Sequence, residues 1–430
     1  MQKIYLSLAI SVIINNAYAY DSKDDADLFK ERSSVDYTQK GIRAGNFTVL
    51  PKYDTSEEYI SNVFYQDSQA SQIKSDFITH FKPGVNVRSD WNRHALNLDF
   101  DTDITASSEI GNQVNYQDLK TRVDGRLDFT RNSHLTGGFA YNSLHESRGS
   151  VDQIGGIGPT FYNTKVIDTF YNHKFNRVSV KTGLDTVRYD YDNVETLTGL
   201  PLQMASRNHW EYMPSIRLGY EIQPEYEAFV KFVDKQAEYD TLVLSNGSGT
   251  PYNRNSTGYN ALGGFAFDLT GLITGDMSLG YLERSYEDAR LQSISGVNGF
   301  VNFKWRPTKL TNVTTRFSHD INETTQVGVA GVMASALDVG LEHELKRNVL
   351  LKAGGSYSHL DYNGYDQTTA IQQNQENRAD DLYGANVGAN YLFNRYINTD
   401  LTYTYQNRDT NYYNSGYDVH QVMLNLRGQY

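Results

Sequence analysis

The 430-residue chain contains no cysteine, only 3 tryptophans and 8 prolines, and no long apolar run beyond its first residues. Without cysteine, neither a disulfide framework nor a thiolate metal or redox site can form. Without ~20 consecutive apolar residues, no segment can cross a bilayer as a helix. The chain has no excess of positive charge either: its formal net charge is −12, which argues against nucleic acid as a partner.

Tyrosine is what the chain has in excess. It carries 33 Tyr, 19 Phe and 34 Gly, and its mean hydropathy is −0.57. Tyrosine favours strands and suits a surface that is apolar at one end and wet at the other. In a transmembrane β-barrel, apolar and polar residues alternate and therefore cancel in any averaged hydropathy. The composition favours such a barrel over its rival, a secreted all-β protein.

The N-terminal residues have the pattern of a secretory signal peptide, which we place at residues 1–19. Lys3 precedes an apolar core from Ile4 to Ile14, and Ala17-Tyr18-Ala19 has the small-x-small form of a cleavage site. Residues 20–43 are polar, and we expect them to form a periplasmic arm. We expect residues 44–430 to form the barrel.

The C-terminal residues alternate between two faces and end on an aromatic ring. Gln421, Asn425, Arg427 and Gln429 lie on one face of this strand, and the other face is apolar: Val422, Leu424, Leu426, Gly428 and Tyr430. The pattern resembles the C-terminal insertion signal of outer-membrane barrels, in which the last strand closes the barrel and ends at the periplasmic interface. We therefore expect these five residues to be that signal.

Short polar turns and longer polar segments alternate along the chain, as tight periplasmic turns and long extracellular loops do in outer-membrane barrels. The short turns lie at residues 90–94, 131–134, 174–177, 223–225, 271–275, 306–309, 346–348 and 394–396. The longer segments lie near residues 107–115, 147–160, 192–206, 241–256, 287–294, 362–378 and 408–415. This spacing predicts an all-β, antiparallel up-and-down barrel of about eighteen strands, or sixteen if two hairpins are misassigned. The first strand is expected at residues 46–54, although Pro51 interrupts it.

Charged residues alternate with apolar ones along several of these strands. Leu96, Leu98 and Phe100 share one face of a strand, and acids occupy the other. A charge facing lipid at the midplane costs up to ~2–4 kcal/mol, so the charged face must meet water. We expect the following residues to line the lumen: Asp99, Asp101, Asp103, Lys120, Arg122, Asp124, Arg126, Asp338, Glu342 and Glu344. These charges either set a field across the lumen or neutralise one another and stiffen the wall.

Aromatic residues beside the short turns are expected to form a girdle at the periplasmic interface, and we assign Trp91, Trp305 and Tyr430 to it. The segment Gly155-Gly156-Ile157-Gly158-Pro159 is interpreted as an extracellular loop that folds over or into the barrel mouth. No serine, histidine and acid combine with a catalytic spacing, so we expect no enzyme, no cofactor and no metal.

The chain also resembles a known family. The resemblance rests on residues 41–51 followed by Asn62-Val63-Phe64, and on the turn-and-strand segments at 89–96 and 175–180. These are similar to the putative β-barrel porins of proteobacteria, the porin 2 type, over residues 41–430. After Pro51 this chain carries Thr55-Ser56-Glu57-Glu58, where the family pattern is more apolar.

Members of that family are often associated with exopolysaccharide or capsule production. The resemblance therefore implies a Gram-negative outer-membrane channel, and its leading function is passage of a polar solute, namely polysaccharide export. The implied partners are outer-membrane lipid, the barrel-assembly machinery, a polysaccharide and periplasmic export proteins. Two alternatives remain: a general diffusion porin for small hydrophilic solutes, and a non-conducting structural or adhesive barrel.

Overall fold

The computed structural model describes residues 37–430, apart from residues 68, 71, 153–155, 197, 198, 200, 243–251, 270, 325, 327 and 365–377. The predicted signal peptide and most of the predicted periplasmic arm lie outside the described residues. The last part of the arm is described: β1 (Ile42–Ala44) pairs with the strand that follows it, and Gly41 N donates a hydrogen bond to Tyr430 O over 3.1 Å. This part of the arm therefore lies against the short-turn end of the sheet.

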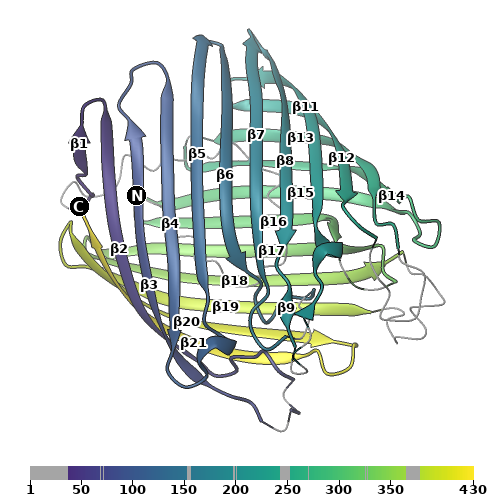
Figure 1. Ribbon diagram of the computed structural model, residues 1–430. Helices are drawn as coiled ribbons and strands as arrows, with labels where there is room; N and C mark the ends of the chain where they lie inside the picture. Colours follow the sequence, from purple (N-terminus) through teal and green to yellow (C-terminus); the bar gives the residue numbers. More distant parts are fainter. Residues whose placement is uncertain are drawn as a thin grey trace.

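Within the described residues, eighteen antiparallel strands of 13–16 residues form one barrel, which closes where the first strand pairs with the last (Figure 1). The first nine are β2 (Phe47–Ile60), β3 (Asp76–Ser89), β4 (Ala95–Ser107), β5 (Gln117–Thr130), β6 (Ser133–His145), β7 (Phe161–Phe175), β8 (Val178–Tyr191), β11 (His209–Gln223) and β12 (Tyr226–Tyr239). The other nine are β13 (Ser256–Leu269), β14 (Ile273–Tyr286), β15 (Ile294–Thr308), β16 (Thr311–Glu323), β17 (Gly331–Lys346), β18 (Val349–Asn363), β19 (Ala379–Leu392), β20 (Ile397–Thr410) and β21 (Tyr417–Gln429). The prediction of eighteen strands is confirmed.

Small elements lie between these strands at the loop end. They are η1 (Gly111–Gln113), η2 (Ala205–Arg207), and β9 (Val194–Glu195), which pairs with β10 (Pro201–Leu202). The near wall runs steeply across the far wall in Figure 1, because strands of a closed barrel tilt against its axis. In the described part of the chain, no helix has the length and apolar character needed to cross a bilayer.

All eight predicted short turns are confirmed, and so is their alternation with long loops. The prediction was wrong in one respect, because it missed two of the long loops, at residues 61–75 and 324–330. Both loops carry apolar side chains that the fold buries: Val63 is 4% exposed, and Val329 and Ala330 are fully buried. The composition of residues 324–330 is therefore close to that of a strand, whereas residues 61–75 are mostly polar.

The first strand was predicted too short, because β2 continues to Ile60. Pro51 is accommodated where β2 changes partner: Val49 pairs with β1, and from Lys52 onward the partner is β21. The missing N–H of proline therefore lies where the hydrogen-bonded partner of β2 changes from β1 to β21. Beyond this point, Glu57 lies on the outer face, where it accepts a hydrogen bond from Thr79 Oγ1 over 2.8 Å.

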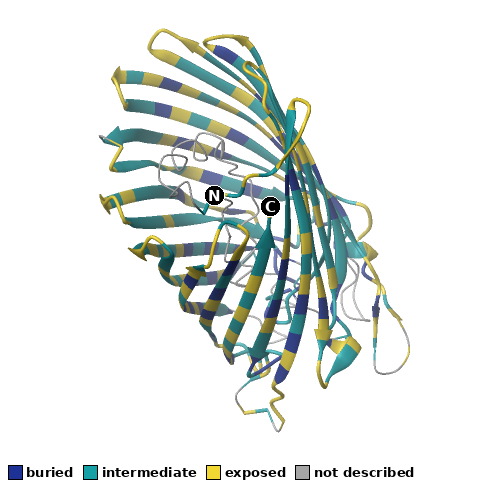
Figure 2. Cartoon of the chain, turned by 90° about the vertical axis from the view of Figure 1, so that its left-hand side faces the viewer, coloured by how far each residue is buried: buried dark blue, intermediate teal, exposed yellow. Residues whose placement is uncertain are grey.

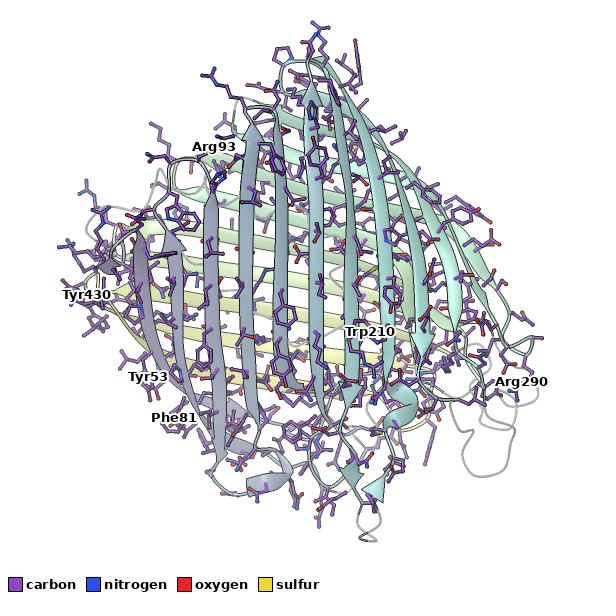
Figure 3. The ribbon with its side chains drawn as sticks, turned by 45° about the horizontal axis from the view of Figure 1, so that its top comes forward. Tyr53, Phe81, Arg93, Trp210, Arg290 and Tyr430 are labelled. Carbon is purple, nitrogen blue, oxygen red and sulfur yellow. The ribbon has the colours of Figure 1, made fainter. Side chains whose placement is uncertain are left out.

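The two faces of the strands differ in character, as the banding in Figure 2 shows. Apolar side chains are highly exposed at alternate positions, up to 67% for Leu279. On the other parity, Lys235 Nζ of β12 lies 2.7 Å from Asp320 Oδ2 of β16, although three strands separate these two in the sheet. Such a contact can form only across the concave side, so this parity faces the lumen. The apolar parity, which includes Tyr53 and Phe81 (Figure 3), faces outward.

A charge placed on the outer face tests this assignment. We expect Leu279→Arg on β14 to lower the free energy of unfolding by about 2–4 kcal/mol, because an arginine at the bilayer midplane loses its hydration. Ser278→Arg, one residue away on the lumen face, is the matched control and should cost much less. Urea unfolding in lipid vesicles measures both variants. Equal losses would show that the outer face does not contact hydrocarbon.

Candidate functional site

The candidate site is the lumen, whose wall is crossed by ion pairs that skip a strand. Arg122 Nη2 of β5 lies 2.7 Å from Asp168 Oδ1 of β7, and this pair passes over Gly138 of the intervening β6. A Cβ at Gly138 would lie 2.5 Å from Arg122 Nη2 and 2.9 Å from Asp168 Oδ1. Lys52 of β2 contacts Asp101 of β4 in the same way. The absence of a side chain at Gly138 therefore lets charges meet along the concave surface.

The structure places the predicted acids of β4 on this concave surface. Asp99 accepts a hydrogen bond from Asn86 Nδ2 over 2.5 Å. Asp103 lies 3.0 Å from His80 Nδ1 and 3.4 Å from Lys82 Nζ. These acids therefore pair with β2 and β3, on the side of β4 away from the predicted lumen cations of β5, Lys120, Arg122 and Arg126.

The predicted charges of β5 pair among themselves and with β7. Arg122 Nε lies 3.1 Å from Asp124 Oδ1, and Arg126 Nε lies 2.8 Å from Asp128 Oδ1. In register, Asp99 is opposite Arg122 and Asp101 is opposite Lys120. The two predicted rows are thus neighbours, but most of their close partners are on other strands. This pattern favours the interpretation in which the charges neutralise one another.

The predicted acids of β17 follow the same parity. Asp338 is opposite Arg316 of β16, and Glu342 is opposite Lys352 of β18. Lys352 Nζ also reaches Asp400 Oδ2 of β20 at 3.2 Å. Glu344 is nearest the short turn, where its N–H donates to Leu310 O over 2.8 Å.

The predicted girdle residues are exposed and lie at the short-turn end. Trp91 is 41% exposed and packs against Phe47 with the ring centroids 5.5 Å apart. Trp305 is 42% exposed. Tyr430 stacks on Tyr396 with the centroids 5.8 Å apart, and Figure 3 shows it at the edge of the barrel. The apolar residues of the proposed insertion signal face outward: Val422, Leu424 and Leu426 are 41–54% exposed.

The loop between β6 and β7 crosses the barrel mouth, and we call its described residues, 146–152 and 156–160, the strap. Thr324 Oγ1 of the β16–β17 loop donates to Asp152 Oδ1 over 2.7 Å, and Gln326 Nε2 donates to Val151 O over 2.8 Å. Eight strands separate the two loops in one direction around the barrel and ten in the other. The strap therefore spans nearly the full width of the mouth, which agrees with the expectation for this loop.

The strap is also held on its own side of the mouth. Arg207 of η2 and Glu146 form a bidentate ion pair with N–O distances of 2.8 and 3.0 Å, and both side chains are buried. Burial opposes the charge of Arg207, but Tyr191 and Glu146 outweigh it and keep the pKa of Arg207 above its usual value. Glycine at position 149 leaves room for the Tyr65 ring, because a Cβ there would lie 2.7 Å from Tyr65 Cδ1.

An apolar cluster and a buried arginine stabilise the part of the opposite wall that the strap contacts. Val151 packs on a cluster of buried side chains from the opposite wall: Val329, Val332, Ala334, Leu360, Tyr362 and Leu382. Arg254, which is fully buried, donates to the carbonyl oxygens of Thr324 and Val329 over 2.6 and 2.8 Å. Fully buried ions held by several partners indicate a rigid arrangement. The loop end is therefore a packed layer.

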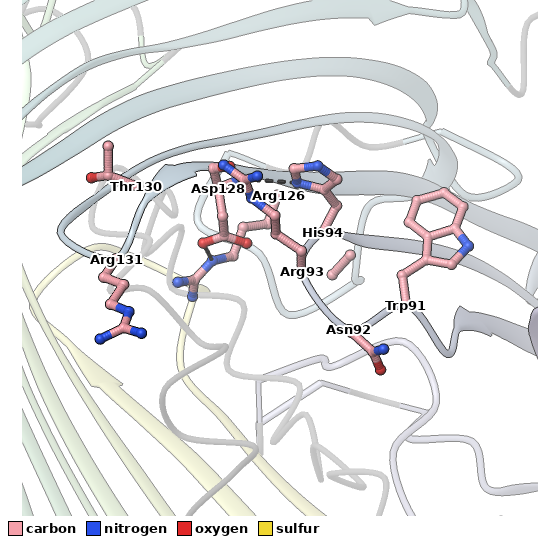
Figure 4. A pocket seen from close by; sticks show the side chains of 9 residues that line it. Trp91, Asn92, Arg93, His94, Arg126, Asp128, Thr130 and Arg131 are labelled. Carbon is pink, nitrogen blue, oxygen red and sulfur yellow. Dashed lines mark hydrogen bonds and ion pairs between the residues drawn. The ribbon is translucent and has the colours of Figure 1, made fainter.

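A pocket of about 650 Å³ lies at the opposite, short-turn end (Figure 4). Trp91, Arg93, His94 and Arg131 line it. Arg93 Nε donates to Asp128 O over 3.0 Å, and Asp128 N donates to His94 Nδ1 over 3.1 Å. These bonds tie the β3–β4 turn to the end of β5. The pocket therefore lies at the rim of the barrel, and its polar residues serve to hold neighbouring strands together.

Sequence reasoning missed the residues that hold the loop end together. Asp152, Thr324, Arg207 and Arg254 are each at most 3% exposed, although all four lie in or beside loops. Polar residues in loops are expected to be solvated, so composition carried no signal for them. The alternation of side chains could have extended the lumen set to Lys181, Arg217 and Lys231, which lie on the charged parity of their strands.

Comparison with known structures shows low sequence identity throughout. The siderophore receptor PiuA from Acinetobacter baumannii is 10% identical, with 91% of this chain and 82% of that chain covered and a TM-score of 0.48. OpdO from Pseudomonas aeruginosa is 12% identical, with 89% and 97% covered and a TM-score of 0.42. For OpdK of the same organism the values are 9%, 89%, 99% and 0.44. A search of curated protein sequences finds no significant match.

A family profile covers nearly the whole chain. The profile described as "Putative beta-barrel porin 2" matches residues 35–430, a range that includes all eighteen strands. With a closed barrel, an apolar outer face and a charged lumen, the structure agrees with that match. The chain therefore belongs to the putative β-barrel porin 2 family, whose members are channels of the Gram-negative outer membrane and not enzymes.

Proposed function

We propose that the protein is a strap-gated channel that exports a polysaccharide across the outer membrane. The observation that carries this proposal is the strap, which is anchored to both sides of the mouth through Asp152 and Glu146. A conduit for a long polymer must be wide when in use and closed at rest. An eighteen-stranded barrel supplies the width, since strand number sets the diameter. The strap supplies a closure that can be withdrawn.

The strap argues against one of the two alternatives, and the lumen wall argues against the other. A general diffusion porin needs a mouth that stays clear, and a layer of buried ions across it argues against that function. A structural or adhesive barrel needs no water-filled lumen, yet the Arg122 side chain of the Arg122–Asp168 pair keeps 38% of its exposure and lies along the lumen. The gated channel is the function that uses both features.

Channel recording in planar bilayers, combined with a gene deletion, tests the proposal. We expect the purified protein to show rare openings, and a linear glycan added on the short-turn side to change their frequency. The deletion should reduce surface polysaccharide. A large steady conductance would instead indicate a diffusion porin, and no conductance under any condition would indicate a structural barrel. Normal surface polysaccharide in the deletion strain would contradict export.

Neutralising the acids of β4 tests whether they border the solute path. We expect Asp99→Asn with Asp101→Asn and Asp103→Asn to shift ion selectivity toward anions, because Lys52 and Lys82 lose the carboxylates that they contact. Asp381→Asn, at a carboxylate bonded to Tyr357 on the outer face, is the control. Reversal potentials in a salt gradient measure the shift. Unchanged selectivity would place these acids away from the path.

A further inference from the structure

A short pattern recurs at the short-turn end of the barrel: a large apolar residue, then any residue, then an arginine. It occurs at five of the eight short turns. The apolar residues of the pattern are 41–57% exposed: Trp91, Phe129, Phe175, Leu345 and Phe393. They follow the outward-facing parity of the strands that they end or extend. The apolar part of the pattern therefore belongs to the surface that meets lipid.

The arginine that ends each pattern lies just beyond this apolar surface. We call these residues the turn arginines: Arg93, Arg131, Arg177, Arg347 and Arg395. Residues two apart in an extended chain share a face, so the turn arginines continue the parity of the apolar side chains past the ends of the strands. An arginine beside exposed hydrocarbon covers apolar surface with its methylene groups and keeps its guanidinium in the polar zone. This order of apolar and cationic side chains is typical of a membrane interface.

The turn arginines have no anionic partner in the described part of the barrel. Among the described residues, the guanidinium groups of all of them except Arg93 form no hydrogen bond or ion pair. Arg93 donates to the backbone carbonyl oxygens of Asp128 and Phe129, which do not neutralise its charge. At the loop end, by contrast, Arg207 is held by the carboxylate of Glu146. The positive charge of the short-turn end is therefore left for a partner outside the barrel.

The short turns are basic although the chain as a whole is acidic. The eight turns between their flanking strands hold six lysines or arginines and two acids, Asp90 and Glu225, whereas the formal net charge of the chain is −12. An acidic protein repels anions on average, so attraction for an anion at this end depends on the local charge. Arginine forms bidentate hydrogen bonds with phosphate, and cations beside a membrane are attracted to anionic lipid. A basic ring next to an apolar belt therefore fits a phospholipid better than a soluble anion.

We propose that the turn arginines bind the phosphate groups of anionic phospholipids in the leaflet that surrounds the short-turn end. The inference goes beyond the proposed function and does not depend on it. The apolar residue of each pattern lies against the acyl chains, and the arginine two residues later donates hydrogen bonds to the head group. Because the contacts are spread over five turns, they hold the barrel at one depth in the membrane.

The three tryptophans allow the two ends of the barrel to be probed separately. Trp91 and Trp305 are exposed at the short-turn end, whereas Trp210 lies at the loop end of β11, away from the rim that carries Arg93 (Figure 3). One barrel carries Trp210→Phe, and a second carries Trp91→Phe with Trp305→Phe. Each is reconstituted in phosphatidylcholine vesicles that contain dibrominated phosphatidylcholine or dibrominated phosphatidylglycerol. Bromine quenches tryptophan fluorescence at close range, so the quenching gives the relative binding constants of the two lipids.

We expect the short-turn tryptophans to report a preference of about fivefold for phosphatidylglycerol at low salt, and the preference to disappear in 1 M salt. Trp210 should report no preference. Arg131→Gln with Arg347→Gln, in the turns next to those of Trp91 and Trp305, should reduce the preference to less than half. Lys120→Gln with Arg316→Gln makes the same change in net charge on the lumen face and should retain it.

Three outcomes would overturn the inference. The first is equal quenching by the two lipids at the short-turn end, or a preference that the Arg131→Gln, Arg347→Gln variant retains in full. The second is an equal loss in the lumen variant, which would reduce the effect to the net charge of the barrel. The third is binding of soluble tetragalacturonate that the same two arginines carry, without any lipid preference, which would assign the turn arginines to a soluble polyanion.

Discussion

Release of the strap is expected to convert rare openings into a large, steady conductance. Replacing residues 148–152 with a Gly-Ser sequence of equal length removes the packing of the Val151 side chain on the opposite wall and the hydrogen bond between Thr324 and Asp152. It also removes Arg148, which donates to Gln113 O over 2.8 Å. The Glu146–Arg207 anchor remains, but with the Asp152 anchor lost the segment gains conformational entropy and no longer spans the mouth. Single-channel recording should show a several-fold rise in mean current.

The control for this variant changes a loop that holds nothing across the mouth. Residues 413–415 of the β20–β21 loop include Tyr413, which is 80% exposed, and the same Gly-Ser replacement there should leave the openings rare. Both variants should fold, because neither touches a strand. If the current of the strap variant equals that of the natural chain, the strap does not limit conduction and the gated mechanism fails.

Removal of a single buried carboxylate is expected to cause the largest loss of stability. Asp380, which is fully buried, contacts Arg378 and Arg408 and accepts a hydrogen bond from Tyr362 Oη over 2.9 Å. Asp380→Leu leaves two buried guanidinium groups without the carboxylate that they share. Breaking a buried ion pair on one side costs about 3–5 kcal/mol. Urea unfolding, or the folded band on unheated gels, should report the loss.

Two further variants show whether charge is the cause. If so, Arg408→Met combined with Asp380→Leu should recover part of the stability, since one of the two stranded charges is removed. Asp381→Asn, at the next residue on the outer face, should have little effect because that carboxylate is partly exposed. An Asp380→Leu barrel as stable as the natural chain would show that water reaches this cluster.

Much of the fold was predictable because it depends on local patterns. A strand of a membrane barrel needs apolar residues at alternate positions, and the residues on each side of Leu98 or Leu424 record that requirement directly. The alternation of short turns and long loops then determines the strand number. Of the two missed loops, residues 324–330 carry buried apolar side chains such as Val329 that resemble those of strands, whereas residues 61–75 are mostly polar and could have been predicted as a loop.

The sequence by itself determined the class of the molecule and which parity meets lipid, because neighbouring side chains along each strand face different solvents. The alternation of short turns and long loops determined the strand count. Only the tertiary structure decided that Asp101 pairs with Lys52, that Arg217 lies between two lysines and that Asp152 reaches Thr324 across the mouth. These relations join residues that are distant in the chain. They depend on register, tilt and closure, because a one-residue shift of any strand would bring different charges together.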